Sequence, residues 1–176
     1  MSSKRGLFLD RDGILLAETG NYVWHLEQTT VLYSAMALIE VAVRHSASLV
    51  IITNQGGIGR KHYCPRQVEM LHQILEKELF NPFGMKPRWL ICPHHPVSSY
   101  CWCRKPATLL FERAIHRARI LPHVSVMIGD QARDMDAARQ SGLQAFGLHA
   151  SQSVQGADRS FTTHAEAALA LDQFWN

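Results

Sequence analysis

The chain has 176 residues, of which 47% are hydrophobic and 19% charged. That length and composition suit one soluble domain with a sizeable core and exclude two full domains. The formal net charge of +3 comes from scattered lysines and arginines, which excludes a basic nucleic-acid-binding run, and no apolar stretch reaches membrane-spanning length. We therefore expect a cytoplasmic monomer that binds neither nucleic acid nor membrane, and that tolerates anionic small molecules.

The first predicted element is a strand over Gly6–Leu9, which leads into two carboxylates one residue apart, Asp10 and Asp12. Alternate side chains of a strand share a face, so the two carboxylates should project together where Gly13 lets the chain turn. Such a pair can hold Mg²⁺, a hard cation that is often shared with substrate phosphate. One carboxylate can then attack phosphorus while the other manages a proton. A polar strand end with a turn is the alternative interpretation.

Only a loop and one helix separate this strand from the next. The loop over Ala17–Thr30 is polar and aromatic, and within it Gly20–Trp24 is a candidate flap beside the substrate. For Tyr22 and Trp24 themselves we favour simple packing over the sheet. Apolar residues at helical spacing predict a helix over Ala35–Ala47. This leaves no room for a large cap domain, so the site should be open and the substrate should help to close it.

The second predicted strand, Leu49–Ile52, is apolar and largely β-branched, as expected of a central strand, and Thr53 follows it. The glycine-rich sequence Asn54–Arg60 comes next. Its free amides could meet a phosphate, and its arginine could bind one bidentately. The candidate substrate-binding residues of this stretch are Asn54, Gln55 and Arg60. A helix should then run from Pro65 through Leu79, with its leucines in the core.

A third strand is predicted over Arg88–Cys92, and the following dozen residues interrupt the alternation of strands and helices. Three thiols and an imidazole at C-x-H and C-x-C spacing would suit tetrahedral Zn²⁺ and leave no position for a catalytic water. These four predicted zinc ligands are Cys92, His94, Cys101 and Cys103. Free buried cysteines are the alternative, and His95 is a lower-ranked substitute for His94. Cys64 lies outside the cluster and reads as a plain thiol.

The rest of the chain continues the alternation. Helices are predicted over Thr108–Arg119, Asp134–Gln140 and Thr163–Phe174, strands over Val124–Ile128 and Leu143–Leu148, and a polar linker over Ser151–Ser160. This order predicts an α/β fold with a Rossmann-like parallel sheet and helices on both faces, in a single domain covering residues 1–176. In open sheets of this kind ligands bind outside the carboxyl ends of the strands, where the polar residues would converge.

The ordered set of polar residues resembles the haloacid dehalogenase superfamily of phosphatases, over about residues 8 to 147. The residues that carry the resemblance are Asp10, Asp12, Thr53, Lys105, Asp130 and Asp134. The resemblance implies that Asp10 is the nucleophile that becomes an aspartyl-phosphate, and that Asp12 protonates the leaving oxygen and then activates water. It implies Mg²⁺ held by Asp10, the Asp12 carbonyl and Asp130. Asp134 would support that site without touching the ion, and Lys105 and the Thr53 hydroxyl would neutralise the remaining phosphoryl charge.

Three longer motifs look like the histidinol-phosphate and heptose-bisphosphate phosphatases within that superfamily. They are F-L-D-R-D-G, T-N-Q-x-G-I-G-R and C-P-H-H-P followed by C-x-C-R-K-P. Because Arg104 and Lys105 directly follow the last zinc ligand, the metal would fix the loop that aims the lysine. The chain departs from the pattern at Leu16, where asparagine is usual, at Gln131, where lysine is frequent, and at Ala107–Leu109, where proline and glycine often occur.

The resemblance leaves the substrate open between two branches. A bisphosphate needs a second anion site, which Arg60 and Arg104 could form, whereas the cationic amine of histidinol would require a carboxylate such as Glu18 or Glu27. We therefore favour removal of the C7 phosphate of D-glycero-D-manno-heptose 1,7-bisphosphate, in a nucleotide-activated heptose pathway, over hydrolysis of histidinol phosphate. A catalytically idle, zinc-stabilised binding protein is the alternative from another class.

Overall fold

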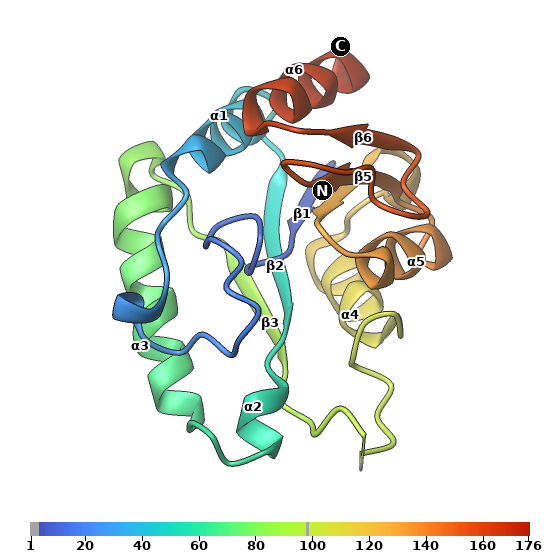
Figure 1. Ribbon diagram of the computed structural model, residues 1–176. Helices are drawn as coiled ribbons and strands as arrows, with labels where there is room; N and C mark the ends of the chain where they lie inside the picture. Colours follow the sequence, from blue (N-terminus) through green and yellow to red (C-terminus); the bar gives the residue numbers. More distant parts are fainter. Residues whose placement is uncertain (1–3, 98) are drawn as a thin grey trace.

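The computed structural model describes residues 4–97 and 99–176 and contains one six-stranded sheet in the order β3-β2-β1-β4-β5-β6, with every neighbouring pair parallel (Figure 1). The strands are β1 (Gly6–Leu9), β2 (Ser48–Asn54), β3 (Arg88–Cys92), β4 (Val126–Gly129), β5 (Gln144–Leu148) and β6 (Arg159–Phe161). The helices are α1 (Met36–Arg44), α2 (Gly56–Gly59), α3 (Pro65–Leu75), α4 (Leu109–Ala118), α5 (Ala132–Gln140) and α6 (His164–Trp175). The predicted single-domain α/β fold is confirmed.

Alternation along the strands divides the core into two layers. Leu7 and Leu9 of β1 face α1, α3 and α6 on one side of the sheet, while Phe8 between them faces α4 and α5 on the other. Buried on both faces, the central strands are therefore continuous apolar runs. Phe8 stacks on Phe111 of α4 with ring centroids 5.6 Å apart, which ties β1 to that helix. The loop that follows β1 and carries Asp10 therefore starts from a strand that is packed on both faces.

The strand order has one point where its direction reverses. The chain builds outward from β1 through β2 to β3 and then returns to place β4 on the other side of β1. At such a switch point the loops after the two central strands diverge and leave a crevice. Asp10 follows β1 and Asp130 follows β4, so the fold places these two residues at the crevice.

Among its described residues, the segment between β1 and β2 contains turns, two isolated β-bridges, two short 3-10 helices and α1, in line with the predicted absence of a cap. The expected packing of Tyr22 and Trp24 over the sheet is wrong, because both side chains pack against Tyr63 instead. Trp24 stacks on Tyr63, with centroids 5.1 Å apart, and Tyr22 meets the edge of the same ring. The flap aromatics therefore pack on the loop between α2 and α3, beside the crevice.

Three stretches differ from the predicted elements. The end of the predicted linker forms the strand β6, whose first two residues are polar and exposed and which is too short to show an apolar alternation. The long helix from Pro65 changes at Glu76 into a π-helical turn ending at Phe80. The glycine-rich loop contains the single helical turn α2. Neighbouring residues pack so closely against this turn that only glycine fits there. A Cβ on Gly59 would overlap the backbone of His95.

The buried His72 of α3 makes the stability of the fold depend on pH. It is 4% exposed and stacks on Trp89 with ring centroids 3.8 Å apart. Burial lowers the pKa of His72 from 6.5 to about 3, and the charge of Arg11 adds to this effect. The unfolded chain takes up its proton first, so stability is full above about pH 6.5 and falls by about 1.4 kcal/mol per pH unit from there toward about pH 3.

We predict that His72→Phe, which keeps an aromatic ring against Trp89, removes this acid sensitivity. Relative to the wild type, the variant should gain about 2 kcal/mol of unfolding free energy on going from about pH 7.5 to about pH 5, measured by urea denaturation. Replacing the exposed His116 of α4 by glutamine is the control and should give no such gain. An identical pH dependence for the wild type and His72→Phe would contradict the prediction.

Candidate active site

Three carboxylates converge at the crevice. Asp10, Asp130 and Asp134 are buried, and each offers an oxygen within 4.8 Å of the other two. Asp130 packs against Gly13, whose positive φ of 79° turns the chain after β1, and a side chain at Gly13 would collide with the Asp130 carboxylate. The glycine at this turn is thus required both by the backbone and by the carboxylate beside it.

Lys105 is the cation of this cluster. Its Nζ forms ion pairs with Asp10 at 3.0 Å and with Asp134 at 2.7 Å, and it donates a hydrogen bond to the carbonyl of Ile52 at 2.8 Å. Burial alone would lower the pKa of Lys105, but the carboxylates of Asp10 and Asp134 outweigh it and raise that pKa. Asn54 clamps the lysine backbone, accepting from its N–H and donating to its carbonyl.

One buried lysine does not balance three buried carboxylates. Burial, followed by the charge of Asp10, raises the pKa of Asp130 to about 7. Burial and a neighbouring carboxylate both disfavour the charged form of Asp130, and a bound cation would favour it. Asp134 already bonds Lys105 and, through its other oxygen, the backbone N–H of Gln131, which leaves Asp10 and Asp130 as the better available oxygens. These hard oxygen donors and the missing positive charge fit a Mg²⁺ ion.

The Asp12 side chain does not join the cluster, so the expected projection of Asp10 and Asp12 as a pair is corrected. Its carboxylate receives three hydrogen bonds of 2.8 to 3.0 Å from Arg11, which is fully buried and also donates to the carbonyl of Val23. Burial raises the pKa of Asp12, against the lowering effect of Arg11 and together with the charge of Asp10. Its side chain remains 29% exposed at the crevice.

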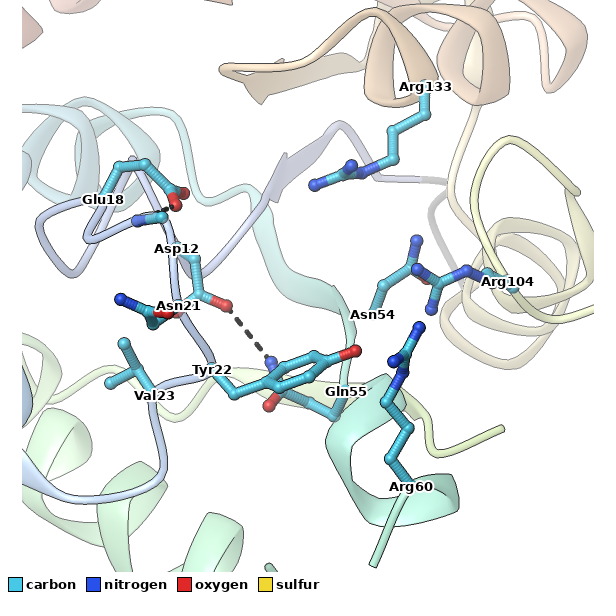
Figure 2. Close-up of a pocket in the computed structure, with 11 residues that line it drawn as sticks. Asp12, Glu18, Asn21, Tyr22, Val23, Asn54, Gln55, Arg60, Arg104 and Arg133 are labelled. Carbon is cyan, nitrogen blue, oxygen red and sulfur yellow. Dashed lines mark hydrogen bonds between the residues drawn. The ribbon is translucent and has the colours of Figure 1, made fainter. Parts of the chain in front are cut away.

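Thr53 and Gln55 extend from the end of β2 toward Asp12. The amide nitrogen of Gln55 donates to the Thr53 hydroxyl at 2.8 Å. It also donates to Asp12 Oδ2 at 3.2 Å (Figure 2). Both side chains are almost fully buried. Thr53 and Gln55 thus belong to one hydrogen-bonded network with Asp12.

The crevice opens into a pocket of about 400 Å³ that is lined mainly by polar side chains. Arg60 from the end of α2 and Arg104 reach toward each other beside Asn54, and Arg133 of α5 reaches in from another side (Figure 2). Glu18 lines the far side, whereas Glu27 is not among the lining residues. Sequence reasoning predicted the first two arginines and missed Arg133, which precedes the predicted helix Asp134–Gln140 and lies exposed in the first turn of the observed α5.

Arg11 was also missed by sequence reasoning. Strand alternation places it on the face opposite Asp10 and Asp12, and so predicts that it points away from both. The strand, however, ends at Leu9, and the turn that follows lets the guanidinium reach back to Asp12. A residue between two aspartates of this kind carries no periodic signal that would reveal such a contact.

The four predicted zinc ligands meet at one point after β3. Ligand atoms of Cys92, His94, Cys101 and Cys103 all lie within 4.8 Å of one another. The sulfurs of Cys92 and Cys101 are 3.7 Å apart, far beyond a disulfide bond and close to the edge of about 3.8 Å that a tetrahedron of Zn–S bonds would have. The donor set fits zinc. His95 lies outside the cluster and accepts a hydrogen bond from the Val97 backbone.

The loop that carries the cysteine–histidine cluster packs against the parts of the chain that hold the pocket arginines. Gly56 of α2 lies against Pro96 and the Arg104 guanidinium, and Gly59 lies against His95. Arg104 Nη1 is buried and has no hydrogen-bond partner among the described residues. The loop therefore supports α2 on one side and leads directly into Arg104 and Lys105 on the other.

Comparison with known proteins places this geometry in a class. Residues 102–170 match the HAD-hydrolase-like family model. The structure of D,D-heptose 1,7-bisphosphate phosphatase from B. bronchiseptica, complexed with magnesium and phosphate, superposes with a TM-score of 0.85 over 96% of this chain and 98% of that one, at 23% identity. The fold is that of a haloacid dehalogenase-like hydrolase.

Curated relatives narrow the class. D-glycero-beta-D-manno-heptose-1,7-bisphosphate 7-phosphatase of Helicobacter pylori is 35% identical over 77% of this chain and 78% of its own. D-glycero-alpha-D-manno-heptose-1,7-bisphosphate 7-phosphatase of Mycobacterium bovis is 30% identical over 94% of this chain and 90% of its own. The chain belongs to the D-glycero-D-manno-heptose-1,7-bisphosphate 7-phosphatase family. No described helix is long and apolar enough to span a membrane.

Proposed function

We propose that this chain is a Mg²⁺-dependent phosphatase that removes the C7 phosphate of D-glycero-D-manno-heptose 1,7-bisphosphate through an aspartyl-phosphate on Asp10. The observation that carries the proposal is the convergence of Asp10, Lys105 and Asp130 at the sheet's switch point, beside a pocket that three arginines line. We also propose that residues 1–176 form one domain and that the enzyme is a cytoplasmic monomer, as its composition suggests.

In the first half-reaction, an Asp10 oxygen attacks phosphorus while the bond to the sugar oxygen breaks and Asp12 gives its proton to that oxygen. Asp12 then takes a proton from water, which attacks phosphorus and releases phosphate and the Asp10 carboxylate. The raised pKa of Asp12 favours the protonated form needed first. Lys105 and the Thr53 hydroxyl would stabilise the charge on the phosphoryl oxygens.

Asp10, the Asp12 carbonyl and Asp130 would hold the magnesium ion, and Asp134 would keep Lys105 in place beside it. Bound Mg²⁺ would neutralise phosphoryl charge and help to keep the phosphorus in line with Asp10. The zinc ion on the cysteine–histidine cluster would have a structural role, since its four ligands leave no position for water. An idle binding protein would have little use for a buried, charge-strained carboxylate cluster of this kind.

Arg60, Arg104 and Arg133 support the bisphosphate over histidinol phosphate. Three guanidiniums at one pocket match a second phosphate, which arginine can bind bidentately. Asn54 would contribute to the same side of the pocket. Glu18 is the observation that favours histidinol phosphate, because its carboxylate could meet an amine. One of its oxygens, however, already accepts from the Gly20 backbone at 2.9 Å and closes the flap turn.

We predict that Arg104→Ala raises KM for the bisphosphate by at least about tenfold while changing KM for a heptose monophosphate by less than about threefold. The reason is that the lost guanidinium would contact only the phosphate that is not cleaved. Initial rates on the two esters measure the split, and Arg117→Ala on the exposed face of α4 is the control. Equal losses on both esters, or histidinol phosphate as the better substrate of the wild type by about ten times, would refute the substrate assignment.

A further inference from the structure

A chain of hydrogen bonds continues from Asp12 beyond Gln55. Gln55 Oε1 accepts from the hydroxyl of Tyr63 at 2.8 Å, while Gln55 Nε2 donates to Thr53 and to Asp12. When Asp12 is ionised, as it is before it takes a proton from water, it can only accept hydrogen bonds, so the amide nitrogen then has to face Asp12 and the amide oxygen has to face Tyr63. The tyrosine hydroxyl, as a donor, therefore sets which way the amide is turned.

Tyr63 is built into this position. It is 5% exposed, and its ring lies against Gly57 of α2, where any side chain would collide with it. Burial raises the pKa of Tyr63 to about 12, so the hydroxyl stays a donor at any pH the enzyme would meet. The Tyr63 ring also contacts two aromatic residues of the flap, Gly20–Trp24. Trp24 stacks on it at an interplanar angle of 17°, and Tyr22, which lines the pocket, meets its edge at 65°.

We propose that Tyr63 is a positioning residue that holds the Asp12 carboxylate, through Gln55, in the orientation required for proton transfer, and that it couples the flap to this carboxylate. The inference rests on the proposed function, in which Asp12 moves the proton. It also gives Gln55 a positioning role in place of the substrate-binding role expected from sequence, because its donors are already used by Thr53 and Asp12. Without the hydroxyl the amide can turn its oxygen toward the carboxylate, which repels it.

The test uses Tyr63→Phe in the full chain, a change that keeps the ring against Gly57 and Trp24. A sugar phosphate has a poor leaving group that needs the Asp12 proton, whereas p-nitrophenyl phosphate has a leaving group that hardly needs it. We expect kcat/KM to fall by about tenfold for the sugar phosphate and by less than about threefold for p-nitrophenyl phosphate, the effect of one lost hydrogen bond. A merely structural role would lower both values equally.

Two further variants complete the experiment. Gln55→Leu should lower the same kcat/KM, and adding Tyr63→Phe to it should cause no further loss, because both residues would act through one chain. Tyr33→Phe, which removes an exposed tyrosine hydroxyl remote from the pocket, is the matched control and should behave as the wild type. Unchanged rates in Tyr63→Phe, equal losses on both esters, or fully additive losses with Gln55→Leu would overturn the inference. A wild type that hydrolyses neither ester would instead refute the proposed function.

Discussion

Replacing Asp10 by asparagine should lower the turnover of every phosphomonoester by at least about 10³-fold. The amide has nearly the shape of the carboxylate but cannot form the aspartyl-phosphate. The same change should leave the fold at least as stable as the wild type, because it removes one of three crowded carboxylates, and Lys105 keeps its bond to Asp134. Turnover should therefore fall while stability does not. A misfolded variant would lose both.

Phosphate release and thermal unfolding, measured on the same preparations, check this expectation. Asp136→Asn is the matched control, since it removes an exposed carboxylate from α5 close to the site, and it should retain full turnover. Removing divalent ions with EDTA should abolish wild-type turnover, and added Mg²⁺ should restore it. Turnover that survives either Asp10→Asn or EDTA would exclude the proposed mechanism.

Replacing Cys101 by serine should have the largest effect on stability. A structural zinc ion contributes its binding free energy to folding, so the loss of one ligand should cost more than about 3 kcal/mol, or about 10 °C in Tm for a chain of this size. Because the loop leads into Lys105 and packs on α2, turnover should fall together with stability. Elemental analysis of protein purified without added metal should find one zinc per wild-type chain.

Cys64→Ser is the natural control for this experiment. Cys64 is an exposed free cysteine outside the cluster and is the N-cap residue of α3, a position that serine suits, so its replacement should leave the zinc content unchanged and should not lower Tm. If the wild type contained much less than one zinc per chain, and Cys101→Ser left that content unchanged, the cluster would be a group of free thiols. Loss of zinc without any fall in Tm would show that the metal does not support the fold.

The sequence by itself determined most strands and helices of the fold and the order in which the candidate site residues follow the strands. Apolar runs followed at once by Asp10, Thr53 and Asp130 mark strands and their ends, because burial of both faces requires such runs. The rule that ligands bind at the carboxyl ends of parallel strands then brings these residues together without any coordinates. The cysteine and histidine spacing is equally local, and the four side chains do converge.

The strand β6 and the neighbours of Asp12 were decided only by tertiary structure. β6 forms because β5 offers an edge to pair with, although two of its three residues are polar and exposed and only Phe161 packs against the core. The grip of Arg11 on Asp12 depends on how the chain turns after β1, and the contact of Tyr63 with Gln55 depends on a glycine that lets the ring approach.

The same distinction holds for the pocket. Arg133 and Arg104 are 29 positions apart in the chain and come from different elements, so no periodic pattern links them. Gln55 likewise reads from sequence as a substrate ligand, and only the packed structure shows that its amide is occupied by Thr53, Asp12 and Tyr63. Local periodicity reports which face of an element is buried, whereas the partner of a polar side chain is set by packing between elements that are distant in sequence.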